Sequence, residues 1–486
     1  MSRSVATDTA TVGVGRRTAA TRDPGSPRWG PGTNGARLVA RRTEKTRSVG
    51  SPTRSVRPER RPTAPRRALP RPRDSGWWLF GYAHSLVGDQ IFYVALTWVA
   101  VTIMSPAEVG LVLVLGSLPR AVVLLAGGVF VDRIGPKRVI IVSDVLRTLV
   151  MVAAAVLSGI GANGTLLIGA LAAVFGVVDG FFLPAVGAAP AFVATLEAQT
   201  RLQALRTVVY RGAPMVGAPL ASALLVAYGA VAAFGVAAFM FAASVVALAL
   251  TRMTRPRPEE DDPSGSAGSA QGVVAEIRDG LRLVSRDRRL LVTVVVLAVL
   301  DFGFAGPMTA GVPLLAAERG WGAGGIGWVL GGFGVGAVVT AVLLTWRRPT
   351  VRAGVVAATG LTLMSLGLLA LGLVDLAGLA PGDEVVLAGV CGALAGVGTG
   401  LFGTLINASL VISTPVRQLG RVMAVAALAG YVGDPVSFSL TGITSQVLGA
   451  SSAFLFGGGF IMVAVVITWV SPAIRTLALP GTERRA

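Results

Sequence analysis

Two carboxylate side chains stand inside long apolar segments and are candidates for binding a proton. Asp89 lies mid-segment, with Ser85 one helical turn before it and Gln90 beside it. Charges in such segments are energetically unfavourable, which makes them candidates for function. A carboxyl group facing a partly desolvated cavity can exchange a proton near neutral pH, and a cationic substrate can compete for it. Asp89 and, in a later segment, Asp301 are therefore candidates for proton or substrate coupling; the alternative for both is a packing role.

Opposite charges within one apolar segment, or in two different segments, indicate ion pairs. Asp144 and Arg147 are three residues apart, which places them on one helical face and predicts that they pair. We expect a structural or gating role for this pair rather than substrate contact. Asp179 and Arg211 are predicted to pair across helices, and both are further candidates for coupling; a structural pair is the alternative. Arg120 either extends to the membrane surface or pairs with an acid.

The composition indicates a membrane protein. Of the 486 residues, 53% are hydrophobic and 14% charged, and the mean hydropathy is +0.70. Soluble domains carry about 25% charged residues. The apolar runs are long and do not alternate, which predicts membrane-spanning helices rather than strands. With one cysteine and one histidine, no intrachain disulfide, metal site or cofactor is expected.

We predict an all-α integral membrane protein with twelve transmembrane helices in two six-helix bundles. The apolar segments lie near 77–103, 107–131, 139–159, 164–190, 203–227, 230–251, 290–315, 322–346, 351–373, 385–410, 420–446 and 452–473. The predicted domains are a disordered basic tail (1–75), a first bundle (76–251), a cytoplasmic linker (252–289), a second bundle (290–473) and a cytoplasmic C-terminal tail (474–486). In the linker, apolar residues at helical spacing predict an amphipathic helix on the membrane surface, namely Val273, Val274, Ile277, Leu281 and Val284.

The placement of positive charge predicts the orientation. With both termini in the cytoplasm, the cytoplasmic segments hold 39 of the 43 Lys and Arg residues, and the external loops hold only Arg319. The tail alone has a net charge of +13. Such a tail can bind anionic lipid or nucleic acid. We favour a dispensable extension instead and expect no nucleic-acid partner.

The two halves resemble each other. Residues 173–234 align without a gap on residues 393–454, including Arg201 with Arg421 and a shared Gly-Ala-x-x-Ala-Phe ending. The matched segments start on the same side of the membrane, so the repeat is parallel. Parallel six-helix repeats predict a central site that opens alternately to either face as the halves rock.

A charged loop between the second and third segments carries a motif. Its residues resemble the loop signature of the major facilitator superfamily and read Gly128-x-x-x-Asp132-Arg133-x-Gly135-x-Lys137-Arg138. Pro136 replaces the arginine that is usual after Gly135. The resemblance implies a transporter fold and a role for the loop as a conformational latch, in which Asp132 faces the start of the eleventh segment. A carboxylate near a helix N-terminus gains about 0.3–1 kcal/mol. The alternative is that the loop charges only orient the chain.

Further features are similar to the bacterial drug and siderophore exporter branch, the enterobactin-exporter-like group. They are Gly88-Asp89, Ser143-Asp144-x-x-Arg147, Pro184-Ala185 and Leu419-Gly420-Arg421-Val422-Met423. The resemblance implies proton-coupled efflux of amphipathic small molecules by a monomer in the inner or plasma membrane, driven by the proton gradient without a cofactor. No phosphate-binding GxxxxGK[ST] motif or catalytic constellation is present in the sequence, so an enzyme is not expected. A nutrient importer or facilitator and a non-transporting receptor or assembly protein remain alternatives.

Overall fold

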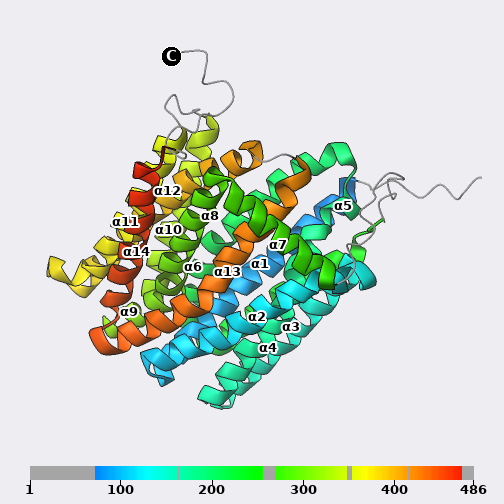
Figure 1. The fold of residues 1–486 in the computed structure, drawn as a ribbon. Coiled ribbons are helices and arrows are strands. Elements are labelled where there is room, and N and C mark those ends of the chain that lie inside the picture. Colours follow the sequence, from blue (N-terminus) through cyan, green and yellow to red (C-terminus); the bar gives the residue numbers. More distant parts are fainter. Residues whose placement is uncertain (1–71, 163, 255–269, 347–352, 414–415, 473–486) are drawn as a thin grey trace, which may run out of the picture. The chain divides into compact units, whose positions relative to one another are not determined.

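The computed structural model describes residues 72–162, 164–254, 270–346, 353–413 and 416–472, within one compact unit of the chain. Every regular element in these residues is a helix (Figure 1), which confirms the predicted all-α fold. Nearly all of the predicted basic tail and all of the C-terminal tail fall outside the described residues. The linker between 255 and 269 does so as well, and the predicted domain boundaries stay predictions.

Helices of the first half follow one another through short connections. Gly135 alone joins α2 to α3, because its φ of 92° lies in a region that glycine adopts without strain. Pro136 then begins α3, where its missing N–H is not needed. The bounds are α1 Pro72–Ile103, α2 Pro106–Ile134, α3 Pro136–Gly159, α4 Thr165–Ala188, α5 Pro190–Val193 and α6 Leu196–Leu250.

The predicted amphipathic helix precedes the second half. This helix, α7 (Ala270–Arg286), buries Val284 among apolar residues of the neighbouring helices α8 and α13. Its position at a membrane surface stays a prediction. The other elements are α8 Arg288–Gly306, a π-helical turn η1 Pro307–Gly311, α9 Val312–Glu318, α10 Gly322–Trp346, α11 Ala353–Gly372, a 3₁₀ turn η2 Val374–Ala377, α12 Pro381–Ser413, α13 Val416–Leu448 and α14 Ser451–Val470.

The helices account for twelve passes. Within the described residues, ten helices are long and apolar enough to cross a membrane. One of them, Arg201–Leu250 in α6, is broken at Gly229, where φ is 75°, and makes two passes. The 33-residue helix α13 packs against α2 and α8 and supplies the twelfth. The predicted twelve-helix architecture is confirmed.

Closely packed glycines show the internal repeat in three dimensions. Gly176 of α4 lies so close to α2 that a Cβ at this position would overlap the carbonyl oxygen of Gly116. Gly396 of α12, 220 positions later, approaches the carbonyl oxygen of Phe333 on α10 in the same way. Because small residues allow such close approach, each half contains a rigid pair of helices, α2 with α4 and α10 with α12.

Two helix pairs make the most extensive contacts between the halves. A Cβ at Gly110 of α2 would lie 2.7 Å from the carbonyl oxygen of Phe438 on α13, and Gly442 of α13 lies against the α2 backbone. Beside this crossing, Gln446 Oε1 accepts a hydrogen bond of 3.1 Å from the backbone N–H of Ala107. The second pair is α6 with α10, which pack along a glycine-lined face of α10.

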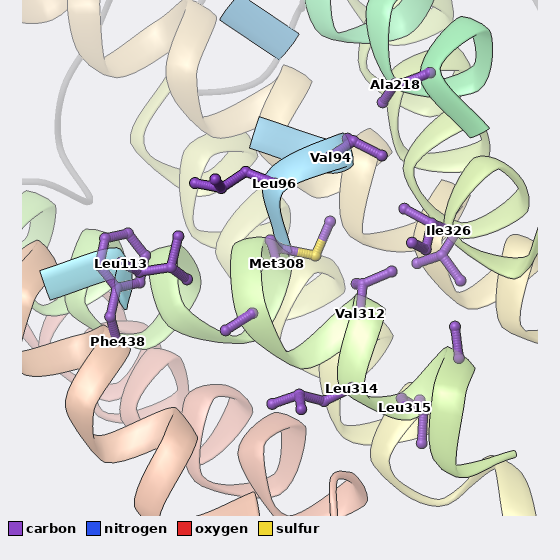
Figure 2. Packing of buried hydrophobic residues seen from close by; sticks show 14 of the residues in the cluster. Val94, Leu96, Leu113, Ala218, Met308, Val312, Leu314, Leu315, Ile326 and Phe438 are labelled. Carbon is purple, nitrogen blue, oxygen red and sulfur yellow. The ribbon is translucent and has the colours of Figure 1, made fainter. Parts of the chain in front are cut away.

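The apolar core continues from one half to the other. In Figure 2, Val94 of α1 lies near Met308 of η1 and Val312 of α9, and Leu113 of α2 lies beside Phe438 of α13. All five side chains belong to a single buried cluster. The halves are therefore held together by apolar packing near the crossing of α2 and α13.

Candidate functional site

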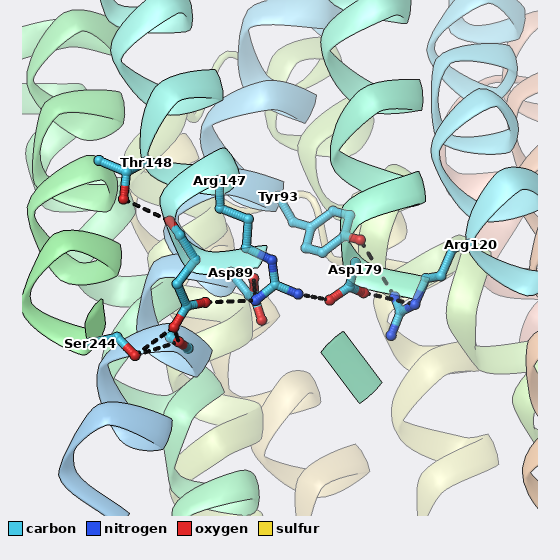
Figure 3. Close-up of polar contacts among 9 residues, drawn as sticks. Asp89, Tyr93, Arg120, Arg147, Thr148, Asp179 and Ser244 are labelled. Atoms are coloured by element: carbon cyan, nitrogen blue, oxygen red, sulfur yellow. Dashed lines mark hydrogen bonds and ion pairs between the residues drawn. The ribbon is translucent and has the colours of Figure 1, made fainter. Parts of the chain in front are cut away.

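Five charged side chains from four helices of the first half meet inside the protein (Figure 3). We call them the charge cluster. Asp89 comes from α1, Arg120 from α2, Asp144 and Arg147 from α3, and Asp179 from α4. As whole residues, Asp89, Asp144, Arg147 and Asp179 are all at least nine-tenths buried. The sequence singled out each residue, and the structure brings all five together.

Arg147 occupies the centre of the charge cluster. Its Nη1 atom lies 3.5 Å from an oxygen of Asp89 and 3.5 Å from one of Asp144, and its Nη2 pairs with Asp179. The guanidinium also lies over the ring of Phe182, with 3.9 Å between its carbon and the ring centroid. The predicted pairing of Asp144 with Arg147 is thus present, but three carboxylates share this one arginine.

Asp144 is held by two hydroxyl groups. Ser85 of α1 donates a hydrogen bond of 2.7 Å to Asp144 Oδ2, and Ser244 of α6 donates one of 2.6 Å to the same oxygen. Hydrogen bonds of this kind stabilise the charged form of a buried carboxylate. These two hydrogen bonds and the contact with Arg147 favour the charged form of Asp144 and hold its carboxyl group beside the arginine.

Asp179 pairs with Arg120 rather than with Arg211, so the predicted pair of Asp179 with Arg211 is wrong. Its Oδ2 lies 2.8 Å from Arg120 Nε, while its Oδ1 contacts Arg147. The reason is that α4 packs against α2 and α3, so Asp179 faces those helices. Arg211 instead lies beside α12, where a Cβ at Gly403 would be 3.3 Å from its Nη2.

Arg120 connects the charge cluster to the second half. Its Nη1 lies 3.4 Å from the hydroxyl oxygen of Tyr93 on α1. Its guanidinium carbon lies 4.9 Å from the ring centroid of Tyr431 on α13. Of the two outcomes expected for Arg120, pairing with an acid is the one observed.

Asp89 is the least satisfied acid of the charge cluster. Its side chain is 12% exposed, against 0% for Asp144 and 5% for Asp179. The Oδ1 atoms of Asp89 and Asp144 both lack a hydrogen-bond partner among the residues that the structure describes, but two hydroxyl groups donate to Asp144 Oδ2. Among the same residues, no hydroxyl group donates to Asp89. Three carboxylates face two guanidiniums, which leaves one negative charge uncompensated. A proton on Asp89 balances that charge with the least loss of hydrogen bonding.

Asp301 does not occupy the position equivalent to Asp89. Gly88 of α1 packs on Phe241 of α6, and Gly303 of α8 packs on Ile461 of α14, which is Phe241 shifted by the 220-residue repeat. Gly88 therefore corresponds to Gly303, and the residue after it to Phe304. Asp301 lies most of a helical turn away, against Gly430 of α13.

The basic residues of the loop motif differ in their contacts. Lys137 donates hydrogen bonds of 2.6 Å and 3.1 Å to the carbonyl oxygens of Thr251 and Ala249, at the end of α6. Arg133 and Arg138 are exposed. A basic side chain at a helix C-terminus is favourable. Lys137 therefore fixes the end of α6 to the start of α3.

Close packing near the start of the motif involves Gly127 rather than Gly128. A Cβ at Gly128 would meet no atom within 4 Å, whereas one at Gly127 would lie 3.0 Å from Pro184 on α4. Asp132 is exposed. The side chains at the start of α13, which its latch contact requires, lie outside the described residues, so the latch stays a prediction.

Several partners of the charge cluster were not found from the sequence. Ser244 and Tyr431 lie in long apolar helices, where a single hydroxyl or phenol gives a weak signal. Among the described residues there is no group of three or more His, Cys, Asp and Glu side chains that could hold a metal ion. The chemistry that this arrangement offers is proton binding and charge pairing.

Residues 78–380 match the family model of the Major Facilitator Superfamily. The chain belongs to this superfamily. It is a multi-pass integral membrane protein of the major facilitator type, and its family is one of transporters rather than enzymes. No curated protein sequence matches this major facilitator protein.

Solved structures of transporters share the fold. A D-xylose–proton symporter is 15% identical, with a TM-score of 0.62 over 84% of this chain and 98% of that chain. The xylose transporter XylE from E. coli, in an inward-open conformation, is 14% identical, with a TM-score of 0.58 over 82% and 94%. A bacterial homologue of the human lysosomal transporter Spinster is 14% identical, with a TM-score of 0.60 over 84% and 97%. At these identities the likeness extends to the fold alone.

Proposed function

We propose that this major facilitator protein is a proton-coupled exporter of amphipathic small molecules, such as drugs, antibiotics or siderophores, in the enterobactin-exporter-like branch. The observation that carries proton coupling is the excess of one carboxylate in the charge cluster. An uncompensated charge in a low-dielectric interior is strongly unfavourable, so the charge cluster favours binding a single proton. Asp89 is the group that takes it up.

The charge cluster belongs to one half only. By the glycine contacts, Arg120 corresponds to Ala337 of α10, because Gly180 and Gly400 pack against the carbonyl oxygens of these two residues. By the 220-residue shift that aligns α4 with α12, Asp179 corresponds to Thr399. A proton therefore changes the charge of the first half relative to the second. Any ligand that binds one arrangement of the halves better than another shifts the equilibrium between them.

Sequence features support export rather than import, because Gly88-Asp89 and Ser143-Asp144-x-x-Arg147 resemble the exporter branch and contribute Asp89, Asp144 and Arg147 to the charge cluster. The proton symporter that shares the fold is a sugar transporter by its description, which keeps a nutrient importer or facilitator as the alternative. A non-transporting receptor has no specific support in the charge cluster. The proposed exporter works as a monomer in the cell membrane, with both termini in the cytoplasm and the proton gradient as its driving force.

Reconstituted protein tests this proposal. Ethidium is permanently charged, so protonation of the dye cannot drive its accumulation, and DNA trapped in the vesicles reports its entry. We expect vesicles with an acidic lumen to accumulate ethidium, and a proton ionophore to abolish the accumulation. Asp89→Asn should reduce gradient-driven accumulation at least tenfold but retain ethidium exchange without a gradient. Asp383→Asn, at an exposed acid on α12, is the matched control.

Three results would contradict the proposal. Accumulation by Asp89→Asn at the wild-type rate would remove Asp89 from coupling. Movement of substrate and protons in the same direction would favour the importer. Wild-type vesicles that move neither protons nor any tested small molecule would favour the non-transporting alternative.

A further inference from the structure

Arg120 contacts both the charge cluster and the second half. It contacts Asp179 at 2.8 Å within the first half and the ring of Tyr431 at 4.9 Å on α13. Within the part of the chain that the structure describes, no other residue of the charge cluster forms a hydrogen bond, ion pair or ring contact with α8 to α14, and Asp179 acts on Tyr431 only electrostatically. A change in the charge cluster therefore reaches the other half mainly through this arginine.

The charged and titratable groups around Arg120 come from three helices. Asp179 of α4 and Tyr93 of α1 face it from the first half, and Tyr431 and Asp434 of α13 face it from the second. Tyr431 also interacts electrostatically with Tyr210 of α6. Arg120 thus divides its positive charge between a carboxylate of its own half and an aromatic ring and a carboxylate of the other.

We infer that Tyr431 is a positioning residue that transmits the protonation state of the charge cluster to the second half, which rests on the proton coupling proposed above. When Asp89 is charged, Arg147 is shared among three carboxylates and Asp179 is free to neutralise Arg120. When Asp89 binds a proton, Arg147 draws more strongly on Asp179. Arg120 is then less neutralised and attracts the Tyr431 ring and Asp434 more strongly.

The direction of the effect follows from this competition. Protonation strengthens a contact between α2 and α13, the two helices that also cross at Gly110 and Gly442. The proton therefore favours the arrangement seen here, in which the ends of α2 and α13 near Ala107 and Gln446 are in contact. Asp179 and Asp434 both attract the Arg120 guanidinium. The ring of Tyr431, which lies under the guanidinium, holds it between the two carboxylates.

Spin-label distances test the role of Tyr431 without relying on transport. Labels at Leu111→Cys on α2 and Val447→Cys on α13, both exposed, report whether these helix ends are together. The background carries Cys391→Ala, which removes the chain's only cysteine. In lipid nanodiscs, we expect the short-distance population of the parent to grow as the pH falls.

Three substitutions separate the cation–π contact from packing. Tyr431→Leu should abolish the pH dependence of the distance, and Tyr431→Phe, which keeps the aromatic face, should restore it. Tyr228→Leu changes a tyrosine of α6 that is 75% exposed and should behave as the parent. A merely structural Tyr431 would alter stability but leave the pH dependence in place.

The outcomes distinguish this inference from the proposed function. If the parent responds to pH and Tyr431→Leu responds equally, Tyr431 has no transmitting role, while proton coupling is untouched. If the parent shows no response to pH, the inference is overturned, and the ethidium assay decides separately whether proton coupling stands. Loss of the response in Tyr431→Leu together with its return in Tyr431→Phe supports the inference.

Discussion

Replacing Asp179 by asparagine removes one charge from the charge cluster without creating a cavity. Asp179 lies 2.8 Å from Arg120 and also contacts Arg147, which keeps Asp89 and Asp144 at 3.5 Å each. With a proton on Asp89, Asp144 and Asp179 balance the two arginines, so the loss of the Asp179 charge falls mainly on Arg120. Removing one partner of a buried ion pair costs about 3–5 kcal/mol. The Arg120 side chain is 21% exposed, so we take the lower end, about 3 kcal/mol, after allowing for solvent screening.

A thermal assay with a thiol-reactive fluorogenic dye can measure this loss. Cys391 is the only cysteine and is 7% exposed, so it reacts when the protein unfolds. At about 2 °C per kcal/mol for a chain of more than about 200 residues, Asp179→Asn should lower the melting temperature by about 6 °C. The double variant Asp179→Asn with Arg120→Gln should lose less than the sum of the single variants, because neither charge is then left alone.

Two results would refute this reasoning. One is a melting temperature for Asp179→Asn within about 1 °C of wild type, since surface changes away from such contacts alter stability by no more than about 0.5 kcal/mol. The other is strict additivity in the double variant, which would show that Asp179 and Arg120 do not stabilise each other. Asp383→Asn, at an exposed acid, is the control for charge removal and should have the same melting temperature as the wild type.

Three further substitutions give sharp expectations. Asp132→Asn should reduce transport of ethidium and leave the melting temperature unchanged, because this acid is exposed; unchanged transport would count against the latch. Gly442→Val should deplete the short-distance population of the spin-labelled pair, since even a Cβ there would lie 2.7 Å from the carbonyl oxygen of Pro106, and an unaltered distance distribution would contradict this. Ser244→Ala removes a hydrogen bond to the buried carboxylate of Asp144 and should lower the free energy of unfolding by about 1.5–3 kcal/mol. The same thiol dye measures this loss. A loss no larger than that caused by replacing an exposed serine with alanine would contradict the bond.

Structural features that depend on regular spacing along the chain were predictable from the sequence. The twelve helices followed from runs of apolar residues, and the repeat followed from the 220-residue match that the contacts of Gly176 and Gly396 reproduce. The pairing of Asp144 with Arg147 followed from helical geometry within one helix. In each case the spacing of residues along the sequence is enough to determine the structural feature.

Features that depend on how a helix is rotated were not predictable. α4 is apolar on every side, so its sequence does not indicate which neighbour Asp179 faces, and Arg211 was chosen in place of Arg120. In the same way, the sequence does not indicate that Gly127 packs against α4 and Gly128, one residue and about 100° away around the helix, does not. The charge cluster depends on four such rotations at once.

The glycine contacts of α4 and α12 also have a mechanical consequence. Where Gly176 and Gly396 touch the backbone of a neighbouring helix, no flexible side chain lies between the two that could absorb a displacement. Such helix pairs resist sliding and move as stiff levers. A displacement of α4 at Asp179 would therefore move α2 with it, with little loss along the two helices.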